Sequence, residues 1–184
     1  MESEVDDPPV DIAWCHGDDS RMSNTAISTA ASAESRRALF DEYMPRVMQC
    51  RLEDLVLETP VQKMPALSER LGMRVLVKRE DLQPVFSFKL RGAYAKLQSL
   101  SDAERQRGVI CASAGNHAQG VALAARHLGI DAVVVMPNIT PEIKINAVRK
   151  LGATVIIQGD DFDDSCGHAQ RMAEQQDRVF IHPY

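Results

Sequence analysis

Lys89 is the residue of this sequence best placed for covalent chemistry. It follows Ser87, a good helix N-cap residue, and stands in the first turn of a helix predicted over residues 88–100. The positive end of the helix dipole and the like charge of Arg91 both disfavour an ammonium group at this position. An uncharged amine is a nucleophile that forms an imine with a carbonyl compound. Lys89 is therefore a candidate for imine-based catalysis.

Aromatic neighbours strengthen this interpretation. Burial of the amine between Phe86 and Phe88 would lower its pKa further, and pyridoxal phosphate is the common aldehyde cofactor that uses such a lysine. The alternative is an ordinary surface lysine, because most lysine side chains are solvated. The position of Lys89 alone does not decide between the two.

A second segment, residues 113–120, joins a predicted strand to a predicted helix and is rich in small residues. It reads Ser113-Ala114-Gly115-Asn116-His117-Ala118-Gln119-Gly120. Small side chains let backbone N–H groups approach a ligand, and helix N-termini bind anions such as an amino-acid carboxylate. Asn116 can cap the helix or offer its amide to a ring oxygen of a cofactor. His117 is a candidate general base, although a histidine in a first helical turn can simply pack or bond locally. An ordinary strand-to-helix turn is the alternative for the whole segment.

Both segments belong to an alternation of strands and helices. Strands are predicted over residues 74–78, 109–112, 132–136, 154–157 and 179–181. Helices are predicted over residues 88–100, 116–128, 141–151 and 162–176. Strands unbroken by polar residues predict an α/β fold in which a parallel sheet lies between two layers of helices. Ligands bind such sheets at the carboxyl ends of the strands, which is where both segments are expected.

The N-terminal region has a different composition. Residues 1–38 are first acidic and then rich in Ser, Thr and Ala, and we expect a disordered tail. Order is expected from Leu39 onward, with Pro45 interrupting any long helix there. The Ser- and Ala-rich stretch weakly suggests a transit peptide for a mitochondrion or plastid, but the acidic residues before it favour a cytoplasmic protein.

Composition excludes several classes of protein. The formal charge of −5 is concentrated in the first 21 residues, and the nearly neutral remainder suggests neither nucleic acid nor a membrane surface as a partner. No apolar run reaches the length of a membrane span. The four cysteines form no Cys-x-x-Cys pair, and neither a disulfide framework nor a metal site is expected.

Taken together, the segments at residues 78–81, 87–93 and 113–120 resemble the biosynthetic threonine ammonia-lyases (threonine dehydratases), which are fold-type II pyridoxal-phosphate enzymes. The resemblance runs from about Thr59 to the last residue. It implies the three-layer, tryptophan-synthase-β-like fold, incomplete at the C-terminus. It also implies that residues 39–85 contribute to a large domain, that residues 86–178 form a small αβ domain, and that residues 179–184 begin the return to the large domain.

The resemblance assigns roles to the candidate residues. Lys89 would hold the cofactor as an imine, Phe88 would lie beside the ring, and Asn116 would bond its phenolic oxygen. The substrate carboxylate would be held by Ser113, Ala114, Gly115 and His117. The implied reaction converts L-threonine to 2-oxobutanoate and ammonia, the first step of isoleucine synthesis, and L-serine to pyruvate. The implied partner is a small amino-acid substrate, and the full-length form is expected to be a homo-oligomer.

Sister families share much of this pattern. Serine racemases and catabolic serine/threonine dehydratases are similar in the Ser-Phe-Lys and Gly-Asn-His segments, whereas Gln83-Pro84-Val85-Phe86 resembles the biosynthetic branch. The family's glycine run for the cofactor phosphate and its residue facing the pyridine nitrogen have no counterpart here. A truncated, non-catalytic member therefore remains an alternative, and the chain alone is expected to bind pyridoxal phosphate poorly.

Overall fold

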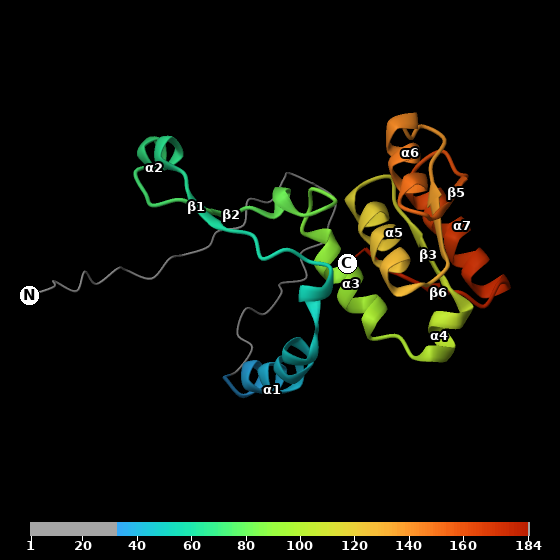
Figure 1. Ribbon diagram of the computed structural model, residues 1–184, viewed down its shortest axis with the longest axis horizontal. Helices are drawn as coiled ribbons and strands as arrows, with labels where there is room; N and C mark the ends of the chain where they lie inside the picture. The colour runs from blue at the N-terminus through green and yellow to red at the C-terminus, as the bar shows by residue number, and fades with distance from the viewer. Residues whose placement is uncertain (1–32, 184) are drawn as a thin grey trace, which may run out of the picture. The chain divides into compact units, whose positions relative to one another are not determined.

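The computed structural model describes residues 33–183 (Figure 1), and within this range the chain divides into two units between Glu42 and Tyr43. Helix α1 (Ala33–Gln49) crosses this division. It begins before Leu39, so residues 33–38 are helical and the expected tail is too long at this end. Pro45 lies inside the helix and does not end it, because one missing N–H removes one hydrogen bond and the turns on both sides continue. The rest of the expected tail lies outside the described residues.

A small antiparallel hairpin follows. Strands β1 (Val61–Lys63) and β2 (Leu76–Lys78) pair with each other, and α2 (Pro65–Leu71) connects them. The strand expected over residues 74–78 therefore exists but is not part of the parallel sheet. Short 3₁₀ turns, η1 (Leu52–Asp54) and η2 (Glu80–Leu82), flank the hairpin. Sequence patterning missed β1 and α2 because such short elements carry too few residues to show a period.

The parallel sheet comprises four strands in the order β5-β4-β3-β6. Their bounds are Val109–Ala112 for β3, Ala132–Met136 for β4, Thr154–Ile157 for β5 and Val179–Phe180 for β6. All three pairings are parallel. Strand β6 pairs with β3, so residues 179–180 belong to this sheet, and the expected domain boundary before Val179 stays a prediction.

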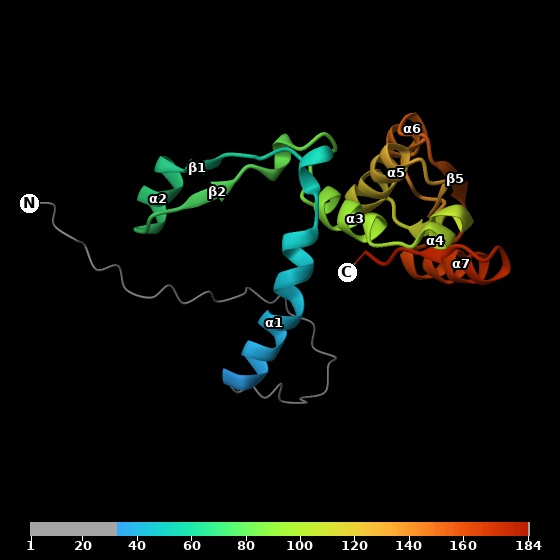
Figure 2. The ribbon, with the colours of Figure 1, turned by 60° about the horizontal axis from the view of Figure 1, so that its bottom comes forward.

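Helices cover both faces of the sheet, as Figure 2 shows. Their bounds are Lys89–Gln98 for α3, Asp102–Arg107 for α4, Asn116–Leu128 for α5, Glu142–Lys150 for α6 and Phe162–Gln175 for α7. Alternate residues of the strands face opposite layers. Val109 and Cys111 pack in the core formed with α3, α5 and α6, whereas Ile110 and Ala112 pack against α7. The three-layer α/β fold expected from the sequence is confirmed.

The strand order places β3 and β6, which are far apart in the sequence, next to each other. From β3 the chain proceeds through β4 to β5 in one direction, and then returns through α7 to β6 on the other side of β3. The carboxyl ends of β3 and β6 therefore lie side by side, and the carboxyl edge of such a sheet is where ligands bind. Residues 113–116 follow β3, and residues 181–183 follow β6.

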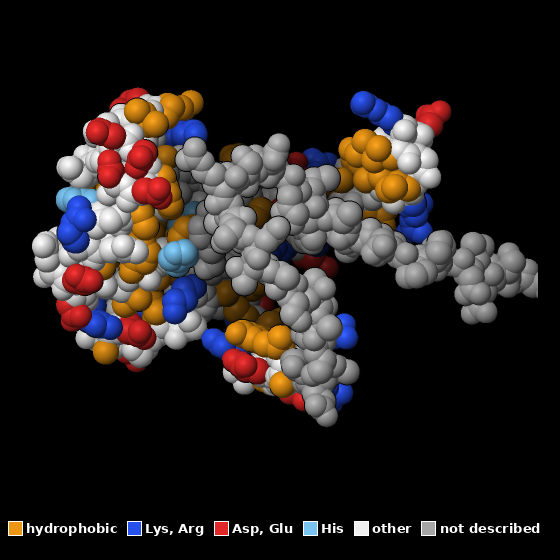
Figure 3. Space-filling view, turned by 180° about the vertical axis from the view of Figure 1, so that it is seen from behind, with side chains coloured by type: hydrophobic (Ala, Val, Ile, Leu, Met, Phe, Trp, Pro, Cys, Tyr) orange, Lys and Arg blue, Asp and Glu red, His pale blue; other side chains and the backbone are white. Residues whose placement is uncertain are grey.

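The hairpin carries an exposed apolar surface. Figure 3 shows apolar side chains gathered over α2 and the hairpin, and Val61, Leu71 and Met73 are each more than half exposed. A cluster of this kind is typical of a surface that contacts other protein.

Within residues 33–183, no helix is long and apolar enough to span a membrane, and no three potential metal ligands lie together. Cys50, Cys111 and Cys166 are free thiols.

Candidate functional site

Lys89 is the first residue of α3. The chain has six lysines, and the five others are exposed while Lys89 is half-buried. Its Nζ donates a hydrogen bond of 2.8 Å to the main-chain oxygen of Pro183 and lies 5.7 Å from the centre of the Phe88 ring. The Lys89 amine therefore reaches the segment that follows β6.

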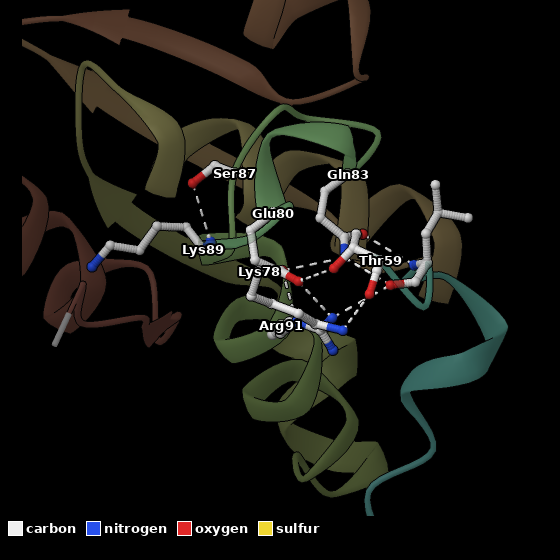
Figure 4. A network of polar contacts seen from close by, with 8 residues as sticks. Thr59, Lys78, Glu80, Gln83, Ser87, Lys89 and Arg91 are labelled. Carbon is white, nitrogen blue, oxygen red and sulfur yellow. Dashed lines mark hydrogen bonds and ion pairs between the residues drawn. The ribbon is translucent and has the colours of Figure 1, made fainter. Parts of the chain in front are cut away.

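Ser87 supports this helix start from one position earlier than expected. The N-cap position is held by Phe88, whose backbone is already helical. The buried Ser87 hydroxyl nevertheless accepts the Lys89 backbone N–H at 3.2 Å (Figure 4). The hydroxyl thus satisfies one of the N–H groups that a helix start leaves without an intrahelical partner.

The phenylalanines do not bury the amine. Phe86 is 78% exposed and Phe88 is 60% exposed, so the expected burial of Lys89 between them is wrong. Phe86 adopts a left-handed backbone conformation, with φ of 57°, which turns the chain into α3. The exposed Phe88 ring is free to contact a ligand held at Lys89.

The charge of Arg91 is neutralised locally. Its guanidinium makes two hydrogen bonds of 2.8 Å to the Glu80 carboxylate, and it also contacts the Leu57 carbonyl. In Figure 4 the Lys89 side chain points away from this pair. The expected like-charge effect of Arg91 on Lys89 is therefore offset by a carboxylate that the sequence analysis left unassigned.

Glu80 is the centre of a polar network. Its carboxylate also accepts hydrogen bonds from the Thr59 hydroxyl at 2.6 Å and from the Gln83 amide at 3.2 Å. The hydrogen bonds from Arg91 are the largest cause that lowers the pKa of Glu80 to about 2. Lys78 completes the network by donating to the Thr59 carbonyl. The network ties the segment before β1, the turn η2 and the first turn of α3 together.

The segment after β3 keeps its backbone accessible. Asn116 is the first residue of α5 and is exposed, and the N-cap position is Gly115, which no side chain caps. The expected capping role of Asn116 is therefore wrong, and its amide is available to a ligand. The Ser113 hydroxyl accepts the Gly115 N–H at 3.2 Å and fixes the turn. The uncapped start of α5 is a site where N–H groups can hold an anion.

His117 is buried. Its Nε2 lies 3.2 Å from the Ile181 carbonyl oxygen, which can only accept, so Nε2 carries the proton. Burial is the main cause that lowers the pKa of His117, and the positive charge of Lys89 also lowers it. The ring therefore works first as a donor that holds the strand end.

Lys89 and His117 both form hydrogen bonds to the segment that follows β6. Both side chains bond main-chain oxygens of residues 181–183. Of the residues expected from the sequence, the structure brings Lys89, Phe88, His117 and the turn at residues 113–116 to this edge. The supporting roles of Glu80, Thr59 and Gln83 were missed, because local periodicity does not mark the contacts that join Glu80 to Arg91 and Thr59, and Gln83 to Leu57, which lie 11 to 26 positions apart.

Comparison with known proteins agrees with this geometry. The family model described as "Pyridoxal-phosphate dependent enzyme" matches residues 52–184. The chain belongs to this family. The family is defined by its dependence on pyridoxal phosphate, and its solved members include the structures to which this chain is similar.

Three relatives are informative. The biosynthetic, chloroplastic threonine dehydratase 1 of Solanum lycopersicum is 54% identical over 143 residues, which is 78% of this chain and 24% of that protein. The processed threonine deaminase isoform 2 of the same plant superposes with a TM-score of 0.76 at 46% identity, over 80% of this chain and 43% of that one. Maize serine racemase superposes with a TM-score of 0.71 at 32% identity, over 78% and 43%. The chain thus spans about a quarter of the curated relative that it matches.

The residues present fit the cofactor of the family. A half-buried lysine stands at a helix start, an exposed aromatic ring lies beside its amine, and the exposed Asn116 amide and the uncapped α5 start complete the set. These groups suit the aldehyde, the ring and the carboxylate of a bound amino acid.

Proposed function

We propose that the protein containing this chain eliminates the β-hydroxyl of L-threonine as water and, after hydrolysis by one water molecule, yields 2-oxobutanoate and ammonia, the entry step of isoleucine synthesis, and that it converts L-serine to pyruvate and ammonia in the same way. The observation that carries the proposal is Lys89 at the start of α3, whose amine reaches the segment after β6, together with the uncapped start of α5, the helix that packs against α3. The 54% identity to a threonine dehydratase supports the same substrate class.

Each residue has a defined task in this proposal. Pyridoxal phosphate supplies an electron sink that stabilises negative charge at the substrate Cα. Lys89 would hold the cofactor, and its amine would take the proton from the substrate Cα. Phe88 packs beside the ring and Asn116 bonds the phenolic oxygen.

The carboxylate of the substrate is held at the start of α5. Ser113, Ala114, Gly115 and the N–H groups around His117 surround this position. A fixed carboxylate orients the Cα–H bond toward the Lys89 amine, and this orientation is the main contribution a binding turn makes to such a reaction.

A second candidate is serine racemisation. The similarity to maize serine racemase favours it, and the two reactions share the removal of the Cα proton. They differ in the next step, because a dehydratase expels the β-hydroxyl and a racemase returns a proton to the opposite face.

Turnover with both substrates separates these functions. Purified full-length protein with pyridoxal phosphate is incubated with L-threonine or L-serine, and keto acid and D-amino acid are measured together. We expect 2-oxobutanoate from threonine and pyruvate from serine, with little D-serine. Racemisation with negligible keto-acid release would sink the dehydratase assignment.

We also propose an oligomeric state and a cellular compartment for the full-length protein. The exposed apolar surface of the hairpin supports a homo-oligomer in the full-length form. The seven acids among the first 21 residues support the cytoplasm, whereas the tomato relative is chloroplastic by name, which keeps a plastid as the alternative.

A further inference from the structure

Gly120 lies where α5 meets the first turn of α3. A Cβ built on Gly120 would approach the Lys89 carbonyl oxygen at 3.2 Å and the Leu90 nitrogen at 3.3 Å. These are backbone atoms, which cannot rotate out of the way as a side chain can. The two helices therefore touch backbone to backbone, and they do so at Lys89 itself.

Nothing else at Gly120 requires glycine. Its φ is not among the positive values, so the backbone conformation suits any residue. Alanine also favours a helix interior more than glycine does. Gly92, in α3, offers a comparison, because a Cβ there would meet no atom within 4 Å. The close approach to Lys89 is thus the physical reason for glycine at position 120.

The position of Gly120 on α5 links this contact to the rest of the site. Asn116 lies four residues before it and His117 three residues before it, so all three share one face of the helix. The contact between Gly120 and Lys89 turns this face toward α3. The absence of a side chain at Gly120 therefore sets the distance between the Lys89 amine and the start of α5.

We propose that Gly120 is a positioning residue for Lys89, which holds the lysine at the distance from the α5 start that a bound amino acid requires. This proposal rests on the proposed role of Lys89. A methyl group at position 120 would displace Lys89 by a few tenths of an ångström. A displacement of this size leaves the fold intact and moves a reactive amine relative to its partners.

Chemical trapping measures this effect without turnover. The full-length protein that contains this chain and its Gly120→Ala and Gly92→Ala variants are incubated with pyridoxal phosphate, reduced with borohydride and digested. The label on Lys89 is compared with the label on the exposed Lys96 of the same helix, and unfolding by denaturant is followed in parallel.

We expect Gly92→Ala to keep the wild-type ratio of Lys89 to Lys96 label. In Gly120→Ala the ratio should fall roughly tenfold while cooperative unfolding is retained. An unchanged ratio in Gly120→Ala, or loss of its cooperative unfolding, would show that this glycine serves packing alone and would overturn the inference. A wild-type chain without excess label on Lys89 would instead contradict the imine role, and the inference with it.

Discussion

Among single residues, the Glu80 carboxylate does most to fix the start of α3. It accepts hydrogen bonds from Arg91, Thr59 and Gln83, which come from three different segments. Gln83 is almost fully buried and exchanges hydrogen bonds with both backbone groups of Leu57. A charge-assisted network of this kind holds its members in one geometry, and Lys89 stands two residues from the arginine that anchors it.

The network predicts a pH-dependent stability. Because the pKa of Glu80 is lowered to about 2, its contribution is complete above the unfolded value near 4.5 and is lost as pH falls toward 2. We expect Glu80→Gln to lower the free energy of unfolding by about 2 kcal/mol at pH 7. Denaturant titrations at several pH values should show this difference shrinking between pH 4.5 and 2.

Asp81 provides the matched control. It belongs to the same turn and pairs with Arg79, but its side chain is 56% exposed. Asp81→Asn should change stability little, because exposed ion pairs contribute little. A Glu80→Gln effect as large at pH 2 as at pH 7 would contradict the assignment.

At the scale of elements, the strands and helices of the parallel sheet follow from local patterns. Both ends of β3, α5, β4 and β5 coincide with the ranges expected from the sequence. Unbroken apolar runs set the strands, and Gly129 ends α5 in the left-handed conformation, with φ of 69°. Strand β1 and helices α2 and α4 were missed because they are short and largely exposed, so their patterns are too weak to recognise.

Gly108 lies directly before β3, at a backbone position that leaves no room for a side chain. It has φ of 78° and ψ of 175°, a combination open essentially to glycine alone. A Cβ there would lie 2.8 Å from the Asp131 carbonyl oxygen. Its own carbonyl accepts the Val179 N–H, so it joins the starts of β3, β4 and β6.

Alanine variants of Gly129 and Gly108 compare the cost of a strained backbone with the cost of a strained backbone and a steric clash together. Gly129→Ala has left-handed strain and open space, and should cost about 1 kcal/mol of unfolding free energy. Gly108→Ala adds a collision with backbone and should cost roughly 3 kcal/mol or more. Equal losses in thermal or denaturant unfolding would show that β3 can shift to accept the methyl group.

At the scale of the whole molecule, the order of the strands decides where the site lies. The sequence placed Lys89 and residues 113–117 in loops at strand ends, but it could not show that β6 pairs beside β3. That pairing brings residues 181–183 opposite the two segments. Long-range contacts of this kind carry no local signal, which is why the partners of Lys89 and His117 were found from the structure and not from the sequence.

The burial of the Lys89 side chain is the second feature that the sequence did not predict correctly. Exposure of Phe86 and Phe88 depends on how the turn before α3 runs, and the left-handed Phe86 directs both rings outward. The identity of the lysine was nevertheless predictable, since the family motifs at residues 87–93 and 113–120 occur together.

The central claim is that Lys89 is the lysine that binds the cofactor. The full-length protein that contains this chain is mixed with pyridoxal phosphate, reduced with borohydride and mapped by peptide mass spectrometry, with Lys89→Arg as the comparison. We predict that Lys89 carries most of the label although the five other lysines of the chain are more exposed, and that Lys89→Arg loses it. Label spread over the exposed lysines, and unchanged in Lys89→Arg, would contradict this account.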